Sequence, residues 1–493
     1  MDELTDTRPL SRALLDRLPE GVAGPLYERS QLSRGIVHVG LGNFHRAHQA
    51  VYLDQLFDQG LDHDWAIVGA SLRENDRAVR DDLQAQDWLT TVVELDPQGF
   101  DARVCGAMID YAEIDPEAVV AAMADEAIRI VSLTITEGGY YVDAEGAFDA
   151  DHADIRHDAA NPHAPRTVFG SIVRALGLRR ERGAVPFTVM SCDNLPENGQ
   201  VARATVLGLA ALQPGDMRDW IAEHLAFPNS MVDCITPATS AREIAMVEQR
   251  FGIRDRRPVA CEPFRQWVME DRFTAGRPRL EMVGVEFTDD VAPYELMKLR
   301  ILNGGHATIA YPAALLDIDY VHDAMAHPLV SGFLAKLERD EIVPTVPDIP
   351  GVSKDDYLAT VTERFSNHAI GDTIPRLCLD GSNRQPKFIV PVIEDRVAAD
   401  ASVEGVALES ALWCRYCFGE TESGTAIAPN DPQWDRLQSQ ARSAKDEPAR
   451  WLAMRDIYGP VGDDERFRTA FTSALGAIWR DGTVRTLEAY LAG

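Results

Sequence analysis

One stretch near the N-terminus constrains the fold more than any other part of the sequence. It runs from an apolar strand (35–39) through the turn Gly40-Leu41-Gly42 into a helix. In such a unit the glycines let the backbone reach a pyrophosphate, and the helix N-terminus attracts the phosphate charge. The third glycine of the usual fingerprint is absent, and His45 stands in its place. The pattern predicts either a dinucleotide site or a tight turn between a strand and a helix. The residues that would bind the dinucleotide are Gly40, Gly42, Asn43 and Phe44.

A second strand, Trp65–Gly69, is followed by side chains that could choose between two dinucleotides. A carboxylate at Glu74 or Asp76 could accept hydrogen bonds from the ribose hydroxyls, and it would repel a 2′-phosphate. Arg73 would instead attract that phosphate. We therefore expect NAD as the cofactor, with NADP left open.

Strands and helices alternate over the first part of the chain. Further strands are expected at Leu89–Leu95, Val104–Ile109, Ile128–Leu133 and Pro186–Ser191, with helices at Glu117–Met123 and Thr167–Arg182. This alternation predicts a doubly wound parallel sheet. Ligands in such sheets bind beyond the carboxyl ends of the strands, which points to Thr134 and Glu137 after one strand and to Asn194 after another. Asn194 could donate to a developing alkoxide, or it could simply form a turn before Pro196.

After a strand at Val283–Phe287 the pattern becomes mainly helical. Helices are expected at Ala292–Leu316, Pro328–Asp340, Ser353–Phe365, Val403–Phe418, Gln433–Ala444, Glu447–Tyr458, Glu465–Arg480 and Thr483–Leu491. The predicted fold class is α/β, with a Rossmann-type, doubly wound, dinucleotide-binding domain over residues 1–287. A mainly α-helical domain over residues 288–493 is expected to supply the substrate site and catalysis.

Lys298 is one of only five lysines in 493 residues, and it lies in an apolar helical segment. An arginine keeps its proton at any useful pH, whereas a partly desolvated lysine amine can act as a base near neutrality. At about 100° per residue, Glu295, Asn303 and His306 share one arc of the helix with Lys298. Three leucines share that arc, so we expect these polar groups to be partly buried. The cluster is compatible with removal of a hydroxyl proton and, equally, with a structural polar cluster on a packed helix.

The composition excludes several classes of function. A formal charge of -30 argues against nucleic acid or an anionic membrane as a partner. The seven cysteines are scattered, and the close pair Cys414 and Cys417 is expected to be buried and structural. No compact metal-ligand motif occurs, so we expect metal-free chemistry. The acidic N-terminus and the lack of a long apolar run favour a cytoplasmic protein.

Several motifs, taken in order, resemble the polyol-specific long-chain dehydrogenases, the mannitol dehydrogenase family. They are Gly40-x-Gly42-x-Phe44-His45-Arg46-Ala47-His48-Gln49, Thr134-x-Thr136-Glu137-Gly138-Gly139-Tyr140, Ser191-Cys192-Asp193-Asn194, Phe227–Asp233, Cys261–Phe264 and Lys298-x4-Asn303-x2-His306. The likeness covers most of the chain. It implies a metal-independent enzyme of two domains that uses NAD or NADP, acts on a polyol or ketose, and is a monomer.

The resemblance also implies roles for individual residues. Lys298 would be the general base in alcohol oxidation and the acid in ketone reduction, with Glu295 as its proton exit. Asn194 and Asn303 would form an oxyanion hole, and His306 would orient the substrate. Asp233 and Arg376 match positions of the substrate pocket.

The substrate is the least constrained part of the prediction. The segment Arg376–Phe388 looks more like the mannitol enzymes of the family, which favours conversion of D-mannitol to D-fructose. A fructuronate or tagaturonate reductase would need a fixed cation, which Arg300, Arg376 or Lys387 could supply. D-arabinitol 4-dehydrogenase is a further alternative within the family. A non-catalytic NAD-binding sensor would belong to another class, and the intact Lys298, Asn303 and His306 speak against it.

Overall fold

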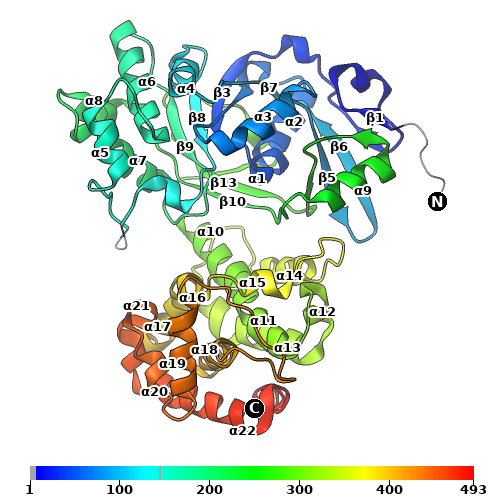
Figure 1. The fold of residues 1–493 in the computed structure, drawn as a ribbon, viewed down its shortest axis with the longest axis vertical. Coiled ribbons are helices and arrows are strands. Elements are labelled where there is room, and N and C mark those ends of the chain that lie inside the picture. The colour runs from blue at the N-terminus through cyan, green and yellow to red at the C-terminus, as the bar shows by residue number, and fades with distance from the viewer. Residues whose placement is uncertain (1–6, 144–145) are drawn as a thin grey trace. The chain divides into compact units, whose positions relative to one another are not determined.

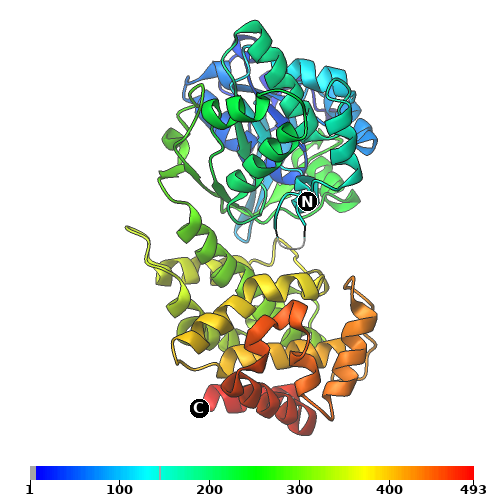
Figure 2. The ribbon, with the colours of Figure 1, turned by 90° about the vertical axis from the view of Figure 1, so that its left-hand side faces the viewer.

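The computed structural model describes residues 7–143 and 146–493. The chain divides into two compact units, Met1–Ala292 and Pro293–Gly493 (Figure 1). The first unit contains strands and helices, and the second is built from helices (Figure 2). The α/β fold class with a Rossmann-type first domain and a helical second domain is confirmed. The assignment of separate binding and catalytic roles to residues 1–287 and 288–493 stays a prediction.

A five-stranded parallel sheet forms the centre of the first unit. Its strands lie in the order β7-β4-β3-β8-β9. Their bounds are β3 Arg34–Val39, β4 Ala66–Ala70, β7 Met108–Tyr111, β8 Ile130–Leu133 and β9 Thr188–Ser191. Along the chain, β4 and β7 are added on one side of β3, and β8 and β9 are then added on its other side. The order therefore reverses between β3 and β8, which is where doubly wound sheets bind their ligands.

Both faces of this sheet are covered because successive apolar residues point to opposite sides. Ile36, for example, belongs to the core beneath helix α2 (Gln49–Asp58), whereas Val37 belongs to the core on the other face. The second face packs against α4 (Pro116–Ala124), α6 (Val168–Arg182) and α7 (Asn198–Ala211). Helix α6 begins where the Thr167 hydroxyl accepts from the Gly170 amide, and it ends at Gly183 with φ of +68°.

The sequence-based reading was wrong about two strands of this unit. Strands β5 (Thr90–Asp96) and β6 (Gly99–Cys105) are not part of the parallel sheet. They form an antiparallel hairpin in which Asp96 pairs with Gly99. Only Pro97 and Gln98 separate the two strands, and so short a loop permits antiparallel pairing alone, because parallel neighbours need a long crossover. The expected single strand Val104–Ile109 is divided between β6 and β7.

Smaller elements complete the first unit. The hairpin lies in a mixed sheet of order β12-β5-β6-β2, and two further sheets have the orders β10-β13-β14 and β1-β11. The additional strands are β1 Arg8–Pro9, β2 Val22–Ala23, β10 Ser230–Asp233, β11 Ile253–Arg254, β12 Val259–Cys261, β13 Gln266–Glu270 and β14 Glu286–Thr288. The additional helices are α1 Asn43–Ala47, α3 Arg77–Gln84, α5 Ala153–Ala160, α8 Met217–His224 and α9 Ala241–Phe251, with 3₁₀ turns at Arg12–Arg17, Arg29–Gln31, His63–Trp65, Glu74–Asp76, Glu137–Tyr140 and Leu280–Val283.

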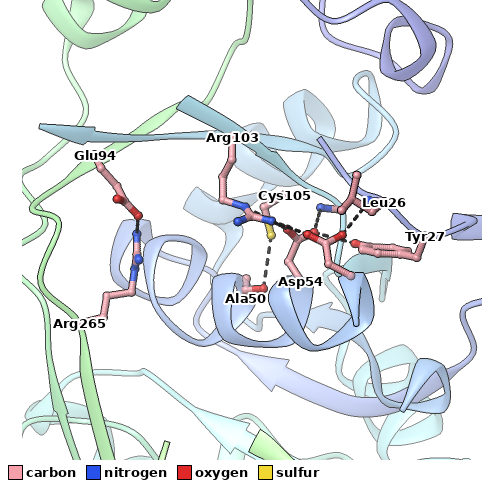
Figure 3. A network of polar contacts seen from close by, with 10 residues as sticks. Leu26, Tyr27, Ala50, Asp54, Glu94, Arg103, Cys105 and Arg265 are labelled. Atoms are coloured by element: carbon pink, nitrogen blue, oxygen red, sulfur yellow. Dashed lines mark hydrogen bonds and ion pairs between the residues drawn. The ribbon is translucent and has the colours of Figure 1, made fainter. Parts of the chain in front are cut away.

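A buried carboxylate joins helix α2 to the hairpin (Figure 3). Asp54 is fully buried and accepts from the Tyr27 hydroxyl at 2.7 Å and from the Gly106 amide at 2.8 Å. Arg103 Nη2 lies 2.6 Å from Asp54 Oδ2 and 3.0 Å from Asp58 Oδ2. A buried charge is tolerated only when it is paired and hydrogen-bonded, and this network meets that condition.

The second unit packs its helices around α18 (Glu404–Cys417), which is buried from Gly405 to Cys417. Helix α18 contacts α22 (Glu465–Ala492) and α11 (Gly304–Leu315). The remaining helices are α10 Ala292–Met297, α12 Val321–Ala326, α13 Pro328–Leu337, α14 Lys354–Phe365, α15 Ile374–Leu377, α16 Gly381–Phe388, α17 Val390–Ala398, α19 Trp434–Ala444, α20 Ala449–Leu452 and α21 Arg455–Tyr458, with 3₁₀ turns at Val343–Thr345 and Gly459–Asp463. Cys414 and Cys417 are buried and unbridged on α18, which agrees with their expected structural role.

One of the expected helices differs from the structure, since the segment 447–458 is broken into α20 and α21. The expected division between Arg480 and Thr483 is confirmed, because Gly482, at φ of +82°, interrupts the helical geometry of α22 there. Two segments also wind as π-helix, Lys298–Asn303 and Glu338–Ile342.

Candidate active site

Gly40 shapes the turn that follows β3. Its φ is +97°, and a Cβ atom there would lie 2.0 Å from the Thr134 carbonyl oxygen. The Thr134 hydroxyl donates to the Gly40 carbonyl at 2.6 Å, so the turn is joined to the end of β8. Only glycine fits this backbone conformation in this space. The sequence predicted the glycine turn, and the structure places it at the switch between β3 and β8.

The start of helix α1 leaves room for a ligand at Gly42. Gly42 is exposed, and a Cβ atom there would meet no atom of the described chain closer than 4.0 Å. The Asn43 side chain joins the start of α1 to residues 237–239, because its amide donates to Pro237 O at 3.2 Å and to Thr239 Oγ1 at 3.0 Å. Phe44 is half-buried and stacks on the His48 ring at 4.9 Å.

The loop after β4 carries the predicted ribose-binding side chains. Asp76 is half-buried, and its Oδ2 accepts from the Ser71 hydroxyl at 2.5 Å. Glu74 is exposed and forms an ion pair with Arg77 at 2.7 Å. Arg73 is exposed, and its Nη2 donates to the Ile135 carbonyl at 3.4 Å, which brings it to the loop after β8.

Asp193 fixes the loop after β8, and the sequence analysis assigned it no role. Its carboxylate accepts from the Ile135 amide at 2.9 Å, the Thr136 amide at 2.8 Å and the Tyr140 hydroxyl at 2.6 Å. Burial raises the pKa of Asp193, and these hydrogen bonds oppose the rise. An aspartate two residues after the end of a buried strand was the available signal. Glu137 follows Thr136 and is exposed.

Asn194 and Asp233 lie at the ends of strands from two different sheets. Asn194 comes directly after Asp193 and is exposed, so its amide is held beside a rigid anchor. Asp233 ends β10, lies opposite Gln266 of β13 and is only 4% exposed.

Lys298 lies in the second unit at the start of a π-helical turn. Lys298 and Glu295 are each 8% exposed, as expected for partly desolvated groups. The segment Lys298–Asn303 winds with π geometry, so angles derived for a regular α-helix do not hold across it. The irregular winding ends before Gly304 and Gly305, since both glycines are in the regular helix α11. Single π turns occur often at functional sites.

His306 is held as a neutral ring in the first turns of α11. It stacks on Phe365 with 4.1 Å between ring centroids and 15° between planes. Burial lowers the pKa of His306 to about 3, and the neighbouring charges are Asp372, Arg376, Arg364 and Arg384. Of these, only Arg376 was predicted as a site residue; all four lie 58 or more residues away from His306, a proximity that one sequence does not reveal.

The three candidate cations for a sugar acid differ in their surroundings. Arg376 forms a two-bonded ion pair with Asp372, with Arg376 Nε 2.5 Å from Asp372 Oδ1. Arg300 is buried, lies 2.6 Å from Asp395 Oδ2 and donates to the Thr345 carbonyl. Lys387 is exposed on α16.

These features of the first unit fit a dinucleotide. The glycine turn lies at the topological switch, and neither Gly42 nor Gly138 would place a Cβ atom within 3.9 Å of its surroundings, so backbone amides can approach phosphates. Within residues 7–143 and 146–493, no three or more His, Cys, Asp or Glu side chains are grouped to hold a metal ion. In the same ranges, none of the helices has the length and apolar character needed to cross a membrane.

Comparisons with known proteins agree with this geometry. Residues 34–282 match the mannitol dehydrogenase Rossmann domain, and residues 290–479 match the mannitol dehydrogenase C-terminal domain. The chain belongs to the mannitol dehydrogenase family. It is 57% identical to a mannitol 2-dehydrogenase of Cereibacter sphaeroides over 96% of this chain and 100% of the relative.

Two solved structures are similar over nearly the whole chain. One is the Pseudomonas fluorescens mannitol 2-dehydrogenase in a ternary complex with NAD and D-mannitol, at 42% identity and a TM-score of 0.88, covering 98% of this chain and 100% of that one. The other is a D-sorbitol dehydrogenase in substrate-free form, at 34% identity and a TM-score of 0.90, covering 97% and 100%. The family resemblance drawn from the sequence motifs is thus confirmed.

Proposed function

We propose that this protein is a metal-independent mannitol 2-dehydrogenase that interconverts D-mannitol and D-fructose with NAD. As a member of the mannitol dehydrogenase family it is an oxidoreductase that acts on CH–OH groups. The observation that carries the mannitol assignment is the 57% identity to a mannitol 2-dehydrogenase along its full length. The relative solved with NAD and D-mannitol supports both cofactor and substrate.

The cofactor would be held by the first unit. The turn Gly40–Gly42 and the start of α1 would face the pyrophosphate, where exposed backbone amides favour negative charge. The Asp76 carboxylate, fixed by Ser71, would accept from the adenosine ribose and disfavour a 2′-phosphate. Thr134 and Glu137 would border the same position from the end of β8. When bound, NAD supplies the hydride acceptor of the reaction.

Lys298 would take the hydroxyl proton of the substrate. Its low exposure suits an amine that must be neutral to act as a base. Glu295, one turn earlier on the helix and equally buried, would pass that proton on. The carboxamides of Asn194 and Asn303 would donate to the reacting oxygen, an interaction that strengthens as negative charge develops on it. His306, being neutral, can both donate to and accept from substrate hydroxyls.

The charge around the candidate substrate residues favours a neutral polyol over a sugar acid. A carboxylate substrate needs a cation that is free to pair with it. Two of the three candidate cations, Arg300 and Arg376, are already paired with Asp395 and Asp372, which leaves the exposed Lys387 as the remaining candidate. We therefore propose that Asp233, Arg376 and Lys387 bind hydroxyl groups.

A matrix of substrates and cofactors tests the proposal. Purified protein is assayed for oxidation of D-mannitol, D-sorbitol and D-arabinitol with NAD and with NADP, and for reduction of fructose, fructuronate and tagaturonate. D-Sorbitol is the second candidate because of the similar D-sorbitol dehydrogenase structure. The highest kcat/KM is expected for D-mannitol with NAD. A clear preference for any other substrate would end the mannitol assignment.

A pair of lysine variants tests the base. Lys298→Ala is expected to keep NADH binding, measured by fluorescence titration, and to lose turnover by about 10²-fold or more. Lys445→Ala removes an exposed lysine of the same unit and should behave as wild type. Near-normal turnover of the first variant would remove Lys298 from the mechanism; turnover lost together with NADH binding would point to a structural role. The monomeric state and the cytoplasmic location expected from the sequence stay predictions.

A further inference from the structure

Two cysteines from separate strands meet in the first unit. Cys261 ends β12, and Cys234 follows the last residue of β10. The next residues along each strand are hydrogen-bonded, with the Glu262 amide donating to the Ile235 carbonyl at 3.0 Å. Both side chains belong to one core cluster, and each thiol shifts the pKa of the other, that of Cys234 upward and that of Cys261 downward. Both are buried, with 7% and 0% of their surface exposed.

A buried arginine lies beside this thiol pair. Arg265 Nη2 is 3.5 Å from Cys261 Sγ and 2.5 Å from Glu94 Oε1. Figure 3 shows the Arg265–Glu94 contact. The hydrogen bond from Cys234 and the positive charge of Arg265 lower the pKa of Cys261, against the effects of burial and of Glu94. Cys261 is therefore the sulfur that ionises first, with a neutral thiol as its neighbour.

The other five cysteines have no such environment. Burial raises the pKa of each of them: Cys105, Cys192, Cys378, Cys414 and Cys417. Cys414 and Cys417 are also close in sequence, which makes them a matched comparison. Because the thiolate is the reactive form, the Cys234–Cys261 pair should react before the others.

We propose that Cys234 and Cys261 form a reversible dithiol–disulfide couple that responds to hydroperoxides. The Cys261 thiolate attacks one peroxide oxygen, the O–O bond breaks, and the released hydroxide or alkoxide takes a proton. Cys261 is then a sulfenic acid. The Cys234 sulfur attacks that sulfur, the S–S bond forms, the S–O bond breaks and water leaves. Two thiols have lost two electrons in total, and the peroxide has gained them.

Arg265 links this couple to the helix that follows the glycine turn. Its Nε donates to the Ala47 carbonyl, the last residue of α1, at 2.7 Å. A disulfide removes the negative charge on Cys261, so Arg265 loses one of its three partners, Cys261, Glu94 and the Ala47 carbonyl. Loss of one charge-assisted contact is expected to weaken NADH binding by roughly threefold to tenfold. This consequence rests on the proposed cofactor role of α1; disulfide formation itself does not.

Peptide mapping of the full-length protein tests the couple directly. The protein is treated with hydrogen peroxide and digested without reduction. The expected product is a cross-link between the peptides of Cys234 and Cys261, lighter by two hydrogen atoms and reversed by dithiothreitol. Cys261→Ser should abolish the cross-link, and Cys234→Ser should leave a sulfenic acid that dimedone traps. The double variant C414S/C417S should oxidise as wild type.

The NADH dissociation constant is measured on the same samples. It should rise on oxidation of the wild type and of C414S/C417S, return with dithiothreitol, and stay unchanged in Cys261→Ser. A wild-type protein that forms no 234–261 cross-link, or that oxidises first at Cys414 and Cys417, would overturn the couple. A cross-link that leaves NADH binding unchanged would overturn the link through Arg265. Either result is independent of which polyol the enzyme oxidises.

Discussion

Glu409 allows a stability prediction whose size follows from its surroundings. Its carboxyl lies within α18 with none of its surface exposed, and Gln385 Nε2 donates to its Oε1 at 2.6 Å. Tyr311 and Tyr458 are titratable neighbours. Burial raises the pKa of Glu409 from 4.5 to about 8, and the hydrogen bond from Gln385 offsets only part of that rise.

The folded protein therefore keeps the Glu409 proton over a pH range in which the unfolded chain releases it. Between these two pKa values the unfolded chain binds fewer protons, so the free energy of unfolding falls as the pH rises. One pKa unit corresponds to about 1.4 kcal/mol. If the full shift of the Glu409 pKa applies, the free energy of unfolding falls by about 3 kcal/mol between pH 5 and pH 8.

Replacing Glu409 by glutamine removes this pH dependence. The glutamine keeps an oxygen that can accept from Gln385. Burying its NH2 group changes the free energy of unfolding by the same amount at every pH, because this group does not titrate. Urea unfolding, followed by tryptophan fluorescence and circular dichroism from pH 5 to pH 8, should show Glu409→Gln gaining on the wild type as the pH rises. Glu404→Gln, at an exposed position of the same helix, is the control. A constant difference between Glu409→Gln and the wild type across this range would refute the reasoning.

Three further predictions concern the candidate site. Gly40→Ala should lower the melting temperature and abolish NADH binding, because its Cβ would strike Thr134, whereas Gly42→Ala should fold normally and only weaken binding; equal melting temperatures would contradict this. The ring signals of His306 in NMR spectra should not titrate between pH 5 and pH 9, since its pKa is held at about 3; a step near pH 6.5 would show an exposed ring. Asp193→Asn should cost about 1–3 kcal/mol in urea unfolding, because one carboxylate serves three donors, and an unchanged midpoint would exclude that anchoring role.

The sequence predicted the parts of the fold that local patterns encode. Strand β3, its glycine turn and the neighbouring strands follow from apolar runs bounded by turn residues. The β5–β6 hairpin was missed because the second strand was expected to begin at Val104, whereas β6 begins at Gly99. Whether two strands are partners or members of different sheets depends on the length of the connection between them, and the late start expected for β6 made that connection look longer than it is.

The candidate site likewise contains residues that local sequence patterns could group and residues that they could not. Lys298, Asn303 and His306 are close in sequence, so helical spacing could group them. Asp193 acts through partners 53 or more residues away, and Asp372 reaches His306 across 66 residues of sequence; such contacts leave no trace in one sequence. The π turn depends on how the surrounding helices pack, so helical spacing alone could not predict it.

The π turn also shows that this segment holds one residue more than a regular helix needs. A π turn is equivalent to one residue inserted into an α-helix. Deleting a single residue between Lys298 and Asn303 would therefore restore regular winding and leave His306 facing Phe365 and the charges around it. The same deletion within the regular winding of α11, before His306, would instead rotate His306 by about 100° about the helix axis.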